Sequence, residues 1–260
     1  MKKTLYSVCE VPLFSGNVDD ASKLILDTAK SGEGAYVCAV NTHSVVCSKE
    51  NNLLENSLNS SLINTADGMP LYWISKLCKL DGISHITGSD LLINLLVCSE
   101  QKGIPVYFYG CEEDTLGLIR ERLEKEHPKL KIAGMEAPGE ITIPPQIDHN
   151  LTKRLAQSKA KIVFVGLGCP KQEIWMNLHA QETGCVFIGI GAAFDFYAGI
   201  KQRSPEWMTE AGLEWLHRMA SEPRRLLKRY FVNNTKFILL VAYYLMLNRL
   251  VKEEQIVNYE

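Results

Sequence analysis

The fold is decided by residues 162–190, which read IVFVGLGCPKQEIWMNLHAQETGCVFIGI. An apolar run suited to a buried strand, Ile162–Val165, leads into two glycines and a segment of helical length over Pro170–Glu182. A second apolar run, Val186–Ile190, follows directly. Two apolar strands joined by such a helix form a βαβ unit, in which the strands run parallel. Pro170 suits the first helical turn, because proline has no amide hydrogen to leave unpaired there.

The same alternation extends over most of the 260 residues. Further strands are expected at Tyr36–Val40, Leu62–Thr65, Val106–Tyr109 and Lys131–Met135. Further helices are expected over Asp19–Lys30, Leu71–Leu80, Ser89–Lys102, Glu113–His127 and Asp148–Gln157. Strands that alternate with helices of about 10–15 residues build a mostly parallel sheet covered by helices on both faces. The sequence therefore predicts an α/β, Rossmann-like fold.

The composition limits the classes of function. The chain has 28 basic and 30 acidic residues, whereas a nucleic-acid-binding protein usually has a basic excess, so nucleic acid is not an expected partner. The eight cysteines include no Cys-x-x-Cys pair, and most lie in apolar runs, as buried thiols of a reducing compartment do. The N-terminal residues Met1–Val8 show no secretory signal, so we expect the protein to work in the cytoplasm.

The pattern changes after about Gly199. Two consecutive helices, over 206–220 and 222–250, follow with no strand between them. We therefore divide the chain into an α/β catalytic domain over 1–199 and a helical C-terminal appendage over 200–260. Phe237–Leu247 is apolar throughout but shorter than the about 20 residues that span a bilayer. It suits a buried core helix, a helix in the membrane interface or a subunit contact in a homo-oligomer.

The first part of this appendage is strongly basic. Six lysines and arginines against one acid, Glu222, give a charge of +5 over residues 217–236. The basic residues are Arg218, Arg224, Arg225, Lys228, Arg229 and Lys236. A solvated helix face normally mixes both signs of charge, so an anion site or a membrane contact is favoured over simple surface charge.

Polar residues follow two of the expected strands, at the edge where open α/β sheets bind ligands. Asn41 and Thr42 come after the strand at Tyr36–Val40, and Asp67 comes after the strand at Leu62–Thr65. All three suit the cap of the next helix. Asn41 is equally suited to hydrogen-bond a polar ligand, and Asp67 to act as a general base that removes a hydroxyl proton. The residues alone leave both interpretations open.

Two glycine-rich loops follow the later strands. The loops at Gly166-Leu-Gly168 and Gly189-Ile-Gly191 offer backbone N–H groups to an anionic or polar ligand. Neither is a dinucleotide-binding motif, because Lys171 and Phe194 stand where the third glycine is needed. Asp195 suits either a ligand hydroxyl or an ion pair. No cofactor and no metal are expected, since the sequence has no Walker motif, no His-Glu-x-x-His and no Asp-x-Asp.

Taken together, these segments follow the order found in one bacterial family. From about Asn41 to Tyr230 the sequence resembles the WecG/TagA/CpsF glycosyltransferases. The segments that carry the resemblance are Thr65–Leu71, Ile86–Leu91, Val165–Glu173, Gly189–Gly199, Arg203–Trp207 and Gly212–Leu226.

The resemblance implies a metal-independent, inverting glycosyltransferase. Such an enzyme moves a sugar from a UDP-sugar to a polyprenyl-diphosphate-linked saccharide at the inner face of the cell membrane. The typical donors are UDP-N-acetylmannosamine and its uronic acid, and some members transfer glucose. The products are intermediates of teichoic acid, enterobacterial common antigen or exopolysaccharide.

The resemblance also implies roles for single residues. Asp67 falls on the family's proposed base and Gln172 on a proposed substrate contact. Arg203 belongs to a matching segment and is expected at the substrate. His85 stands where the family often has an arginine, and an imidazole is a weaker partner for a phosphate or carboxylate than a guanidinium. Donor specificity that depends on that arginine is therefore in doubt.

The family's appendage carries arginines for the diphosphate and touches the membrane. Arg218, Arg225 and Lys228 fall on this part, and Lys228 stands where arginine is frequent. Two other classes stay open. A sugar-nucleotide epimerase or dehydrogenase would need NAD, and the missing third glycine in both loops argues against it. A membrane-associated nucleotide-binding module without catalytic activity would bind UDP and transfer nothing.

Overall fold

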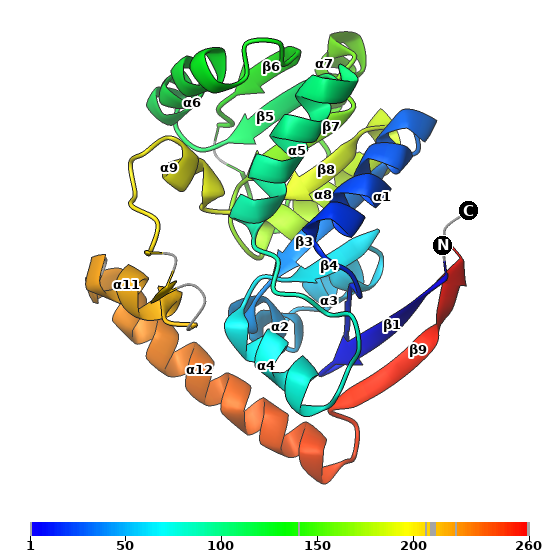
Figure 1. Ribbon diagram of the computed structural model, residues 1–260, viewed down its shortest axis with the longest axis vertical. Helices are drawn as coiled ribbons and strands as arrows, with labels where there is room; N and C mark the ends of the chain where they lie inside the picture. The colour runs from blue at the N-terminus through cyan, green and yellow to red at the C-terminus, as the bar shows by residue number, and fades with distance from the viewer. Residues whose placement is uncertain (1, 140, 206, 209–211, 222, 259–260) are drawn as a thin grey trace.

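The structure is a computed structural model (Figure 1). It describes residues 2–139, 141–205, 207–208, 212–221 and 223–258. For residues 2–5, 218, 221, 223–230 and 253–258 it describes the backbone but not the side chains.

A six-stranded sheet forms the centre of the molecule, with the strand order β4-β3-β8-β7-β5-β6 (Figure 1). All neighbouring strands in it run parallel. The strands are β3 (Ala35–Val40), β4 (Ile63–Ala66), β5 (Val106–Gly110), β6 (Ile132–Glu136), β7 (Ile162–Gly166) and β8 (Val186–Gly189). The six predicted strands are confirmed, with ends that differ by at most one residue. The predicted α/β, Rossmann-like fold is therefore confirmed.

Helices cover both faces of this sheet, as Figure 1 shows. They are α1 (Val18–Ser31), α2 (Thr42–Ser48), α3 (Asn52–Asn59), α4 (Met69–Leu77), α5 (Gly88–Lys102), α6 (Glu113–Glu126), α7 (His149–Ser158), α8 (Lys171–Thr183) and α9 (Ala193–Tyr197).

Strand β7 shows how the core is divided between the two faces of the sheet. Its Ile162 and Phe164 are buried with residues of α1, α5, α6 and α9. Its Val163 and Val165 are buried with residues of α2, α3, α7 and α8. Alternate side chains of a strand point to opposite faces, so a strand that is apolar throughout requires both helical layers.

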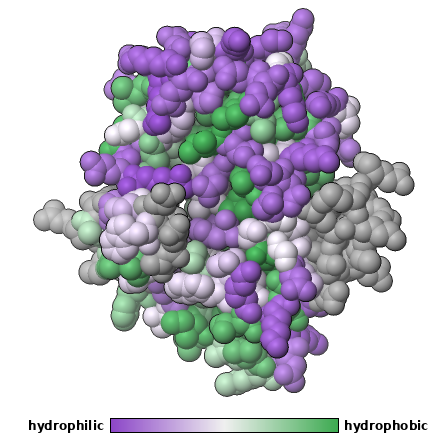
Figure 2. Space-filling view, viewed as in Figure 1, coloured by the Kyte–Doolittle hydropathy of each residue, from purple (hydrophilic) through white to green (hydrophobic). Residues whose placement is uncertain are grey.

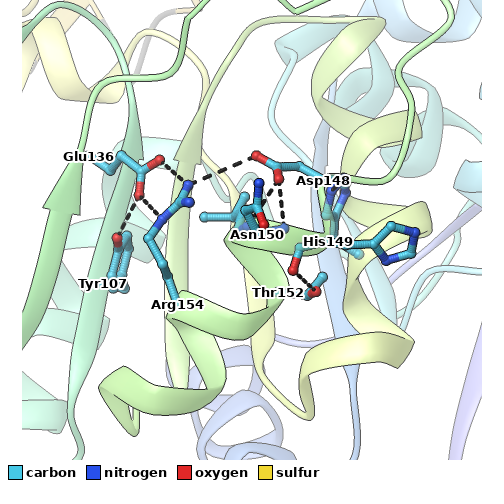
Figure 3. Close-up of polar contacts among 9 residues, drawn as sticks. Tyr107, Glu136, Asp148, His149, Asn150, Thr152 and Arg154 are labelled. Atoms are coloured by element: carbon cyan, nitrogen blue, oxygen red, sulfur yellow. Dashed lines mark hydrogen bonds and ion pairs between the residues drawn. The ribbon is translucent and has the colours of Figure 1, made fainter.

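A polar cluster joins the edge strand β6 to β5 and α7 (Figure 3). Arg154 donates to the Glu136 carboxylate through Nε at 3.1 Å and Nη2 at 2.6 Å, and the Tyr107 hydroxyl donates to the same group at 3.0 Å. Burial, together with the Glu136 carboxylate, raises the pKa of Tyr107 to about 12. The phenol therefore keeps its proton at neutral pH and stays a donor, which holds the edge strand in place.

A second sheet joins the two ends of the chain. Its strands β1 (Lys2–Val8), β2 (Val11–Leu13) and β9 (Val251–Asn258) are antiparallel, in the order β2-β1-β9. These three strands were not predicted from the sequence. Strand β1 also pairs with the neighbouring β2, but its pairing with β9 joins residues almost a whole chain apart, which no local pattern in the sequence indicates.

The appendage contains α11 (Glu214–Ser221) and α12 (Pro223–Met246). Two helices were predicted here, and the structure corrects the start of the first and the end of the second. Gly212, with a left-handed φ of 73°, precedes α11 and interrupts the helix expected over 206–220. The second helix ends at Met246, before β9, and does not reach residue 250. The division of the chain at residue 199 stays a prediction.

Helix α12 packs along α2 with one face. Its Phe237 and Tyr244 are buried, the Lys236 ammonium donates to Glu50 at 2.5 Å, and the Tyr244 hydroxyl donates to Glu10 at 2.5 Å. Its other face exposes Phe231, Ile238, Leu239, Tyr243, Leu245 and Met246. Figure 2 shows hydrophobic side chains gathered over the C-terminal half of α12. Within the described residues, no helix is both long enough and apolar enough to cross a membrane.

Candidate active site

A cavity of about 630 Å³ opens at the carboxyl ends of β3, β4, β7 and β8. The loops after these strands line it, together with the first turns of α2, α5, α8 and α9 and the segment after α9. This is the sheet edge at which open α/β folds bind ligands. Six of the predicted site residues line the cavity: Asn41, Asp67, Gly168, Gln172, Gly191 and Asp195.

Asp67 directly follows β4 and is half-buried in the wall of the cavity. Its Oδ1 accepts a hydrogen bond from the Gly88 N–H at 3.1 Å, and its Oδ2 accepts from Asn41 Nδ2 at 3.4 Å. Gly88 is the first residue of α5, so the carboxylate lies at the positive end of that helix. The backbone is held as well, since His85 Nε2 lies 2.8 Å from the Asp67 carbonyl oxygen and the Asp67 N–H donates to Val40.

Asn41 is a helix cap, the first of the two interpretations that the sequence left open, and its contact with a ligand stays a prediction. Its Oδ1 accepts from the N–H groups of His43 at 3.0 Å and Ser44 at 3.3 Å, so the residue caps α2. Two backbone donors on Oδ1 fix the orientation of the amide, which turns Nδ2 toward Asp67. A side chain that caps one helix therefore also orients a carboxylate in the cavity.

Gln172 joins the two glycine loops. Its Oε1 accepts from the Gly191 N–H at 3.1 Å and from the Leu167 N–H at 3.4 Å. The Gln172 Nε2 lies against Gly189, and a Cβ on residue 189 would come within 2.5 Å of this nitrogen. The loop after β7 and the loop after β8 are thus held together at the floor of the cavity by one buried amide.

The segment after α9 carries two ion pairs. Lys201 Nζ lies 2.8 Å from Asp195 Oδ2, and both residues line the cavity. Arg203 Nη2 lies 2.6 Å from Asp90 Oδ1, and Thr87 donates to Asp90 Oδ2 at 2.7 Å. Burial alone would raise the pKa of Asp90, but the hydrogen bonds from Arg203 and Thr87 outweigh it and lower that pKa below its ordinary value. Arg203 thereby ties this segment to the start of α5.

The other predicted site residues lie elsewhere. In the described part of the chain, four are outside the lining: Thr42, His85, Gly166 and Arg203. Thr42 begins α2, and Gly166 ends β7, where a Cβ would come within 2.4 Å of the Phe194 ring. The side chains of Arg218, Arg225 and Lys228 lie outside the described residues, although the backbone places them in α11 and α12.

Three further residues of the lining were not singled out from the sequence: Glu173, Lys201 and His217. Glu173 stands beside Gln172 in the segment Val165–Glu173 that carries the family resemblance. An acid in the first turn of a helix, however, usually faces solvent and interacts favourably with the positive end of the helix dipole. Lys201 gave no signal in the sequence, and His217 lies in the segment Gly212–Leu226 but was not chosen there, since both reach the cavity only through the tertiary fold.

Comparison with known proteins shows which family the chain belongs to. The family model for "Glycosyl transferase WecG/TagA/CpsF family" matches residues 6–250. The chain is 30% identical over 194 residues to the N-acetylglucosaminyldiphosphoundecaprenol N-acetyl-beta-D-mannosaminyltransferase of Bacillus subtilis, covering 74% of this chain and 73% of the relative. It is 29% identical over 194 residues to the enzyme of the same name from Bacillus spizizenii, covering 74% of each. The family match contains every loop that lines the cavity. The chain belongs to the WecG/TagA/CpsF family of glycosyltransferases.

Proposed function

We propose that this enzyme transfers N-acetylmannosamine from UDP-N-acetylmannosamine to N-acetylglucosaminyl-diphosphoundecaprenol, with inversion at the anomeric carbon. The names of the two Bacillus relatives support both the sugar and the acceptor. One observation carries the mechanism: the Asp67 carboxylate is held in the cavity wall by the Gly88 N–H and the Asn41 amide. The product is an intermediate of teichoic acid or another cell-surface polysaccharide.

The proposed reaction is a single displacement. Asp67 removes the proton of the acceptor hydroxyl as that oxygen forms a bond to the anomeric carbon of the donor. The bond from the same carbon to the diphosphate oxygen breaks, and UDP leaves with the electron pair. General-base assistance of this kind typically accelerates a reaction by about 10²–10⁴-fold. The two hydrogen bonds to Asp67 fix the plane of its carboxylate while leaving it acceptor positions for this proton.

The leaving UDP carries growing negative charge, which the site has to stabilise. Lys201 brings a cation into the cavity, and the loop at Gly168 precedes the N-terminus of α8, whose N–H groups suit an anion. Arg218, Arg225 and Lys228 are proposed to close over the diphosphate from the appendage, since arginine forks match phosphate geometry. His85 takes another role in this proposal, holding the backbone of Asp67.

The acceptor lipid lies in a membrane, and the appendage is proposed to bring the enzyme there. The basic segment at 217–236 would meet anionic headgroups at the inner face of the cell membrane. The exposed apolar face of α12 would enter the interface beside it. The enzyme is then cytoplasmic and peripherally attached, and a homo-oligomer that buries the same face is the alternative.

The experiment that tests the function supplies the purified full chain with N-acetylglucosaminyl-diphospholipid and one donor at a time. The donors are UDP-N-acetylmannosamine, UDP-N-acetylglucosamine, UDP-glucose and UDP-N-acetylmannosaminuronic acid. Mass spectrometry of the lipid should show one added N-acetylhexosamine with UDP-N-acetylmannosamine alone. Transfer from UDP-glucose or from the uronic acid in its place would contradict the proposed donor.

A further inference from the structure

Glu173 is a cavity residue that the mechanism above does not use. It lies in the first turn of α8, next to Gln172, and lines the cavity with a side chain that is only 2% exposed. Among the described residues its Oε2 has no hydrogen-bond partner. Buried polar atoms are almost always paired, so an orphaned oxygen in the lining of a ligand cavity points to a partner that the ligand supplies.

The hydrogen bonds around Gln172 identify the two oxygens of Glu173. Because the Gln172 Oε1 accepts from the backbone of Leu167 and Gly191, its Nε2 is the atom that turns toward Glu173. That Nε2 donates to Glu173 Oε1 at 3.4 Å. Oε1 is therefore the accepting, carbonyl-like oxygen, and in a protonated carboxyl the hydroxyl is at Oε2.

The surroundings of Glu173 favour the protonated form. Burial raises the pKa of this carboxyl above its ordinary value, although its own backbone N–H, Cys169 and Gln172 oppose the shift in part. An ionised carboxylate without a cation is costly to bury, and among the side chains that the structure describes no lysine or arginine acts directly on Glu173. The titratable groups of the described residues that border it or share its cavity are Cys38, Cys169, Asp67, Asp195, Lys201 and His217.

We propose that Glu173 is a substrate-binding residue whose neutral carboxyl donates a hydrogen bond from Oε2 to an oxygen of the bound UDP-sugar. This inference rests on the proposed function. A neutral acid beside a diphosphate or a sugar carbonyl gains a hydrogen bond, whereas a carboxylate there would repel a diphosphate. No bond of the substrate forms or breaks at Glu173, and the proton stays on the residue.

Two variants separate a donated hydrogen bond from other roles. Glu173→Gln keeps a donor, because the amide NH₂ replaces the hydroxyl, and Glu173→Leu removes it. Isothermal titration of the full chain with UDP-N-acetylmannosamine should show affinity within about twofold of wild type for Glu173→Gln. It should show a loss of about three- to tenfold for Glu173→Leu, the usual worth of one hydrogen bond. Glu182→Leu, at the exposed end of the same helix, is the matched control and should bind as wild type.

Titration with UDP alone locates the contact. An equal loss for UDP and UDP-N-acetylmannosamine in Glu173→Leu assigns the accepting oxygen to the nucleotide, and a loss for the sugar nucleotide alone assigns it to the sugar. A pH series adds a measurement that a structural role would not change. Wild type should lose affinity for UDP-N-acetylmannosamine as pH rises and Glu173 ionises, and Glu173→Gln should lack that part of the decline.

Two results would overturn the proposal. The first is binding by Glu173→Leu as tight as that of wild type for both ligands. The second is a loss in Glu173→Gln as large as in Glu173→Leu, with an unchanged melting temperature, since it would show that the carboxylate is the required form. If Glu173→Leu does not fold, the affinity of Glu173→Gln and its pH series still test whether a neutral side chain at this position donates the hydrogen bond. Wild type that binds the UDP-sugar but transfers nothing would contradict the proposed function and leave this binding test intact.

Discussion

At the scale of single residues, the site depends on close backbone approach. Gly189 ends β8 at the point where the Gln172 amide crosses to the neighbouring loop. A Cβ at this position would lie 2.5 Å from Gln172 Nε2 and 2.7 Å from Met176 Cε. Only glycine leaves room here for the amide that holds the two loops together.

We predict that Gly189→Ala lowers the free energy of unfolding by about 1–3 kcal/mol, as overpacking of a core does. It should also raise KM for the UDP-sugar, because Gln172 must move away from Gly191. Denaturant unfolding and steady-state kinetics measure the two effects. Gly117→Ala is the control, since a Cβ there meets no atom within 4 Å in the middle of α6 and should stabilise by about 0.5–1 kcal/mol. Wild-type stability and kinetics in Gly189→Ala would contradict the assigned role of this glycine.

Part of the site was predictable from the sequence for a simple physical reason. Polar residues such as Asn41 and Asp67, placed directly after buried strands, have to lie at the carboxyl edge of a parallel sheet. The choice between cap and ligand contact for Asn41 depended on its neighbours, which only the fold brings together. Glu173 was not predicted because its burial comes from the packing of α8 against the sheet.

At the scale of elements, α8 depends on a buried histidine. His179 is fully buried and stacks on Trp175, with ring centroids 4.2 Å apart. Its Nδ1 lies 2.8 Å from the Trp175 carbonyl oxygen and therefore carries the proton, and its Nε2 accepts from the Asp148 N–H at 2.9 Å. This ring links α8 to the start of α7. Burial lowers the pKa of His179, although its bond to Trp175 opposes the shift.

A lowered histidine pKa makes stability depend on pH. The folded protein favours the neutral His179 ring. The stabilisation linked to this preference is fully present above the ordinary histidine pKa of about 6.5, and it is lost as pH falls from there toward the lower pKa of His179 in the folded protein. We predict that the melting temperature falls between pH 7.5 and pH 5.5. His179→Phe, which keeps the stacking without the titration, should show a smaller fall. Differential scanning calorimetry of both proteins across this pH range makes the measurement. Equal falls in wild type and His179→Phe would refute the assignment.

The elements themselves were predictable where their apolar pattern is continuous. Strands β7 and β8 are runs of mainly large apolar residues that are buried on both faces, and these runs show directly in the sequence. Helices α2 and α3 were not predicted, because they are short and begin at asparagine caps, Asn41 and Asn51, that equally suit turns. Strand β9 has a charged sequence, and its pairing with β1 depends on long-range contact.

At the scale of the whole molecule, the net charge of −2 is an average over unlike parts. Residues 217–236 alone carry +5, so the rest of the chain is acidic. Beside this basic segment α12 exposes an apolar face, with Leu239 64% and Met246 83% exposed. Basic charge next to exposed apolar side chains is the combination that attaches a helix to an anionic lipid surface.

We therefore predict that the protein floats with vesicles that contain anionic phosphatidylglycerol. Leu239→Ser combined with Met246→Ser should reduce the bound fraction at least about tenfold, because two large apolar side chains no longer enter the interface. Leu118→Ser, on an exposed part of α6, is the control and should bind as wild type. If the double variant still floats but changes its sedimentation coefficient, the face is instead a contact between subunits.

Replacement of Asp67 by asparagine tests its proposed role as the base of the glycosyl transfer. In Asp67→Asn, kcat for transfer from UDP-N-acetylmannosamine to the N-acetylglucosaminyl-diphospholipid should fall about 10²–10⁴-fold. Affinity for the UDP-sugar should stay within about twofold of wild type, since the amide keeps the shape of the carboxylate. Asp114→Asn, on an exposed turn of α6, controls for loss of charge and should keep full activity. Turnover by Asp67→Asn within about threefold of wild type would contradict the claim.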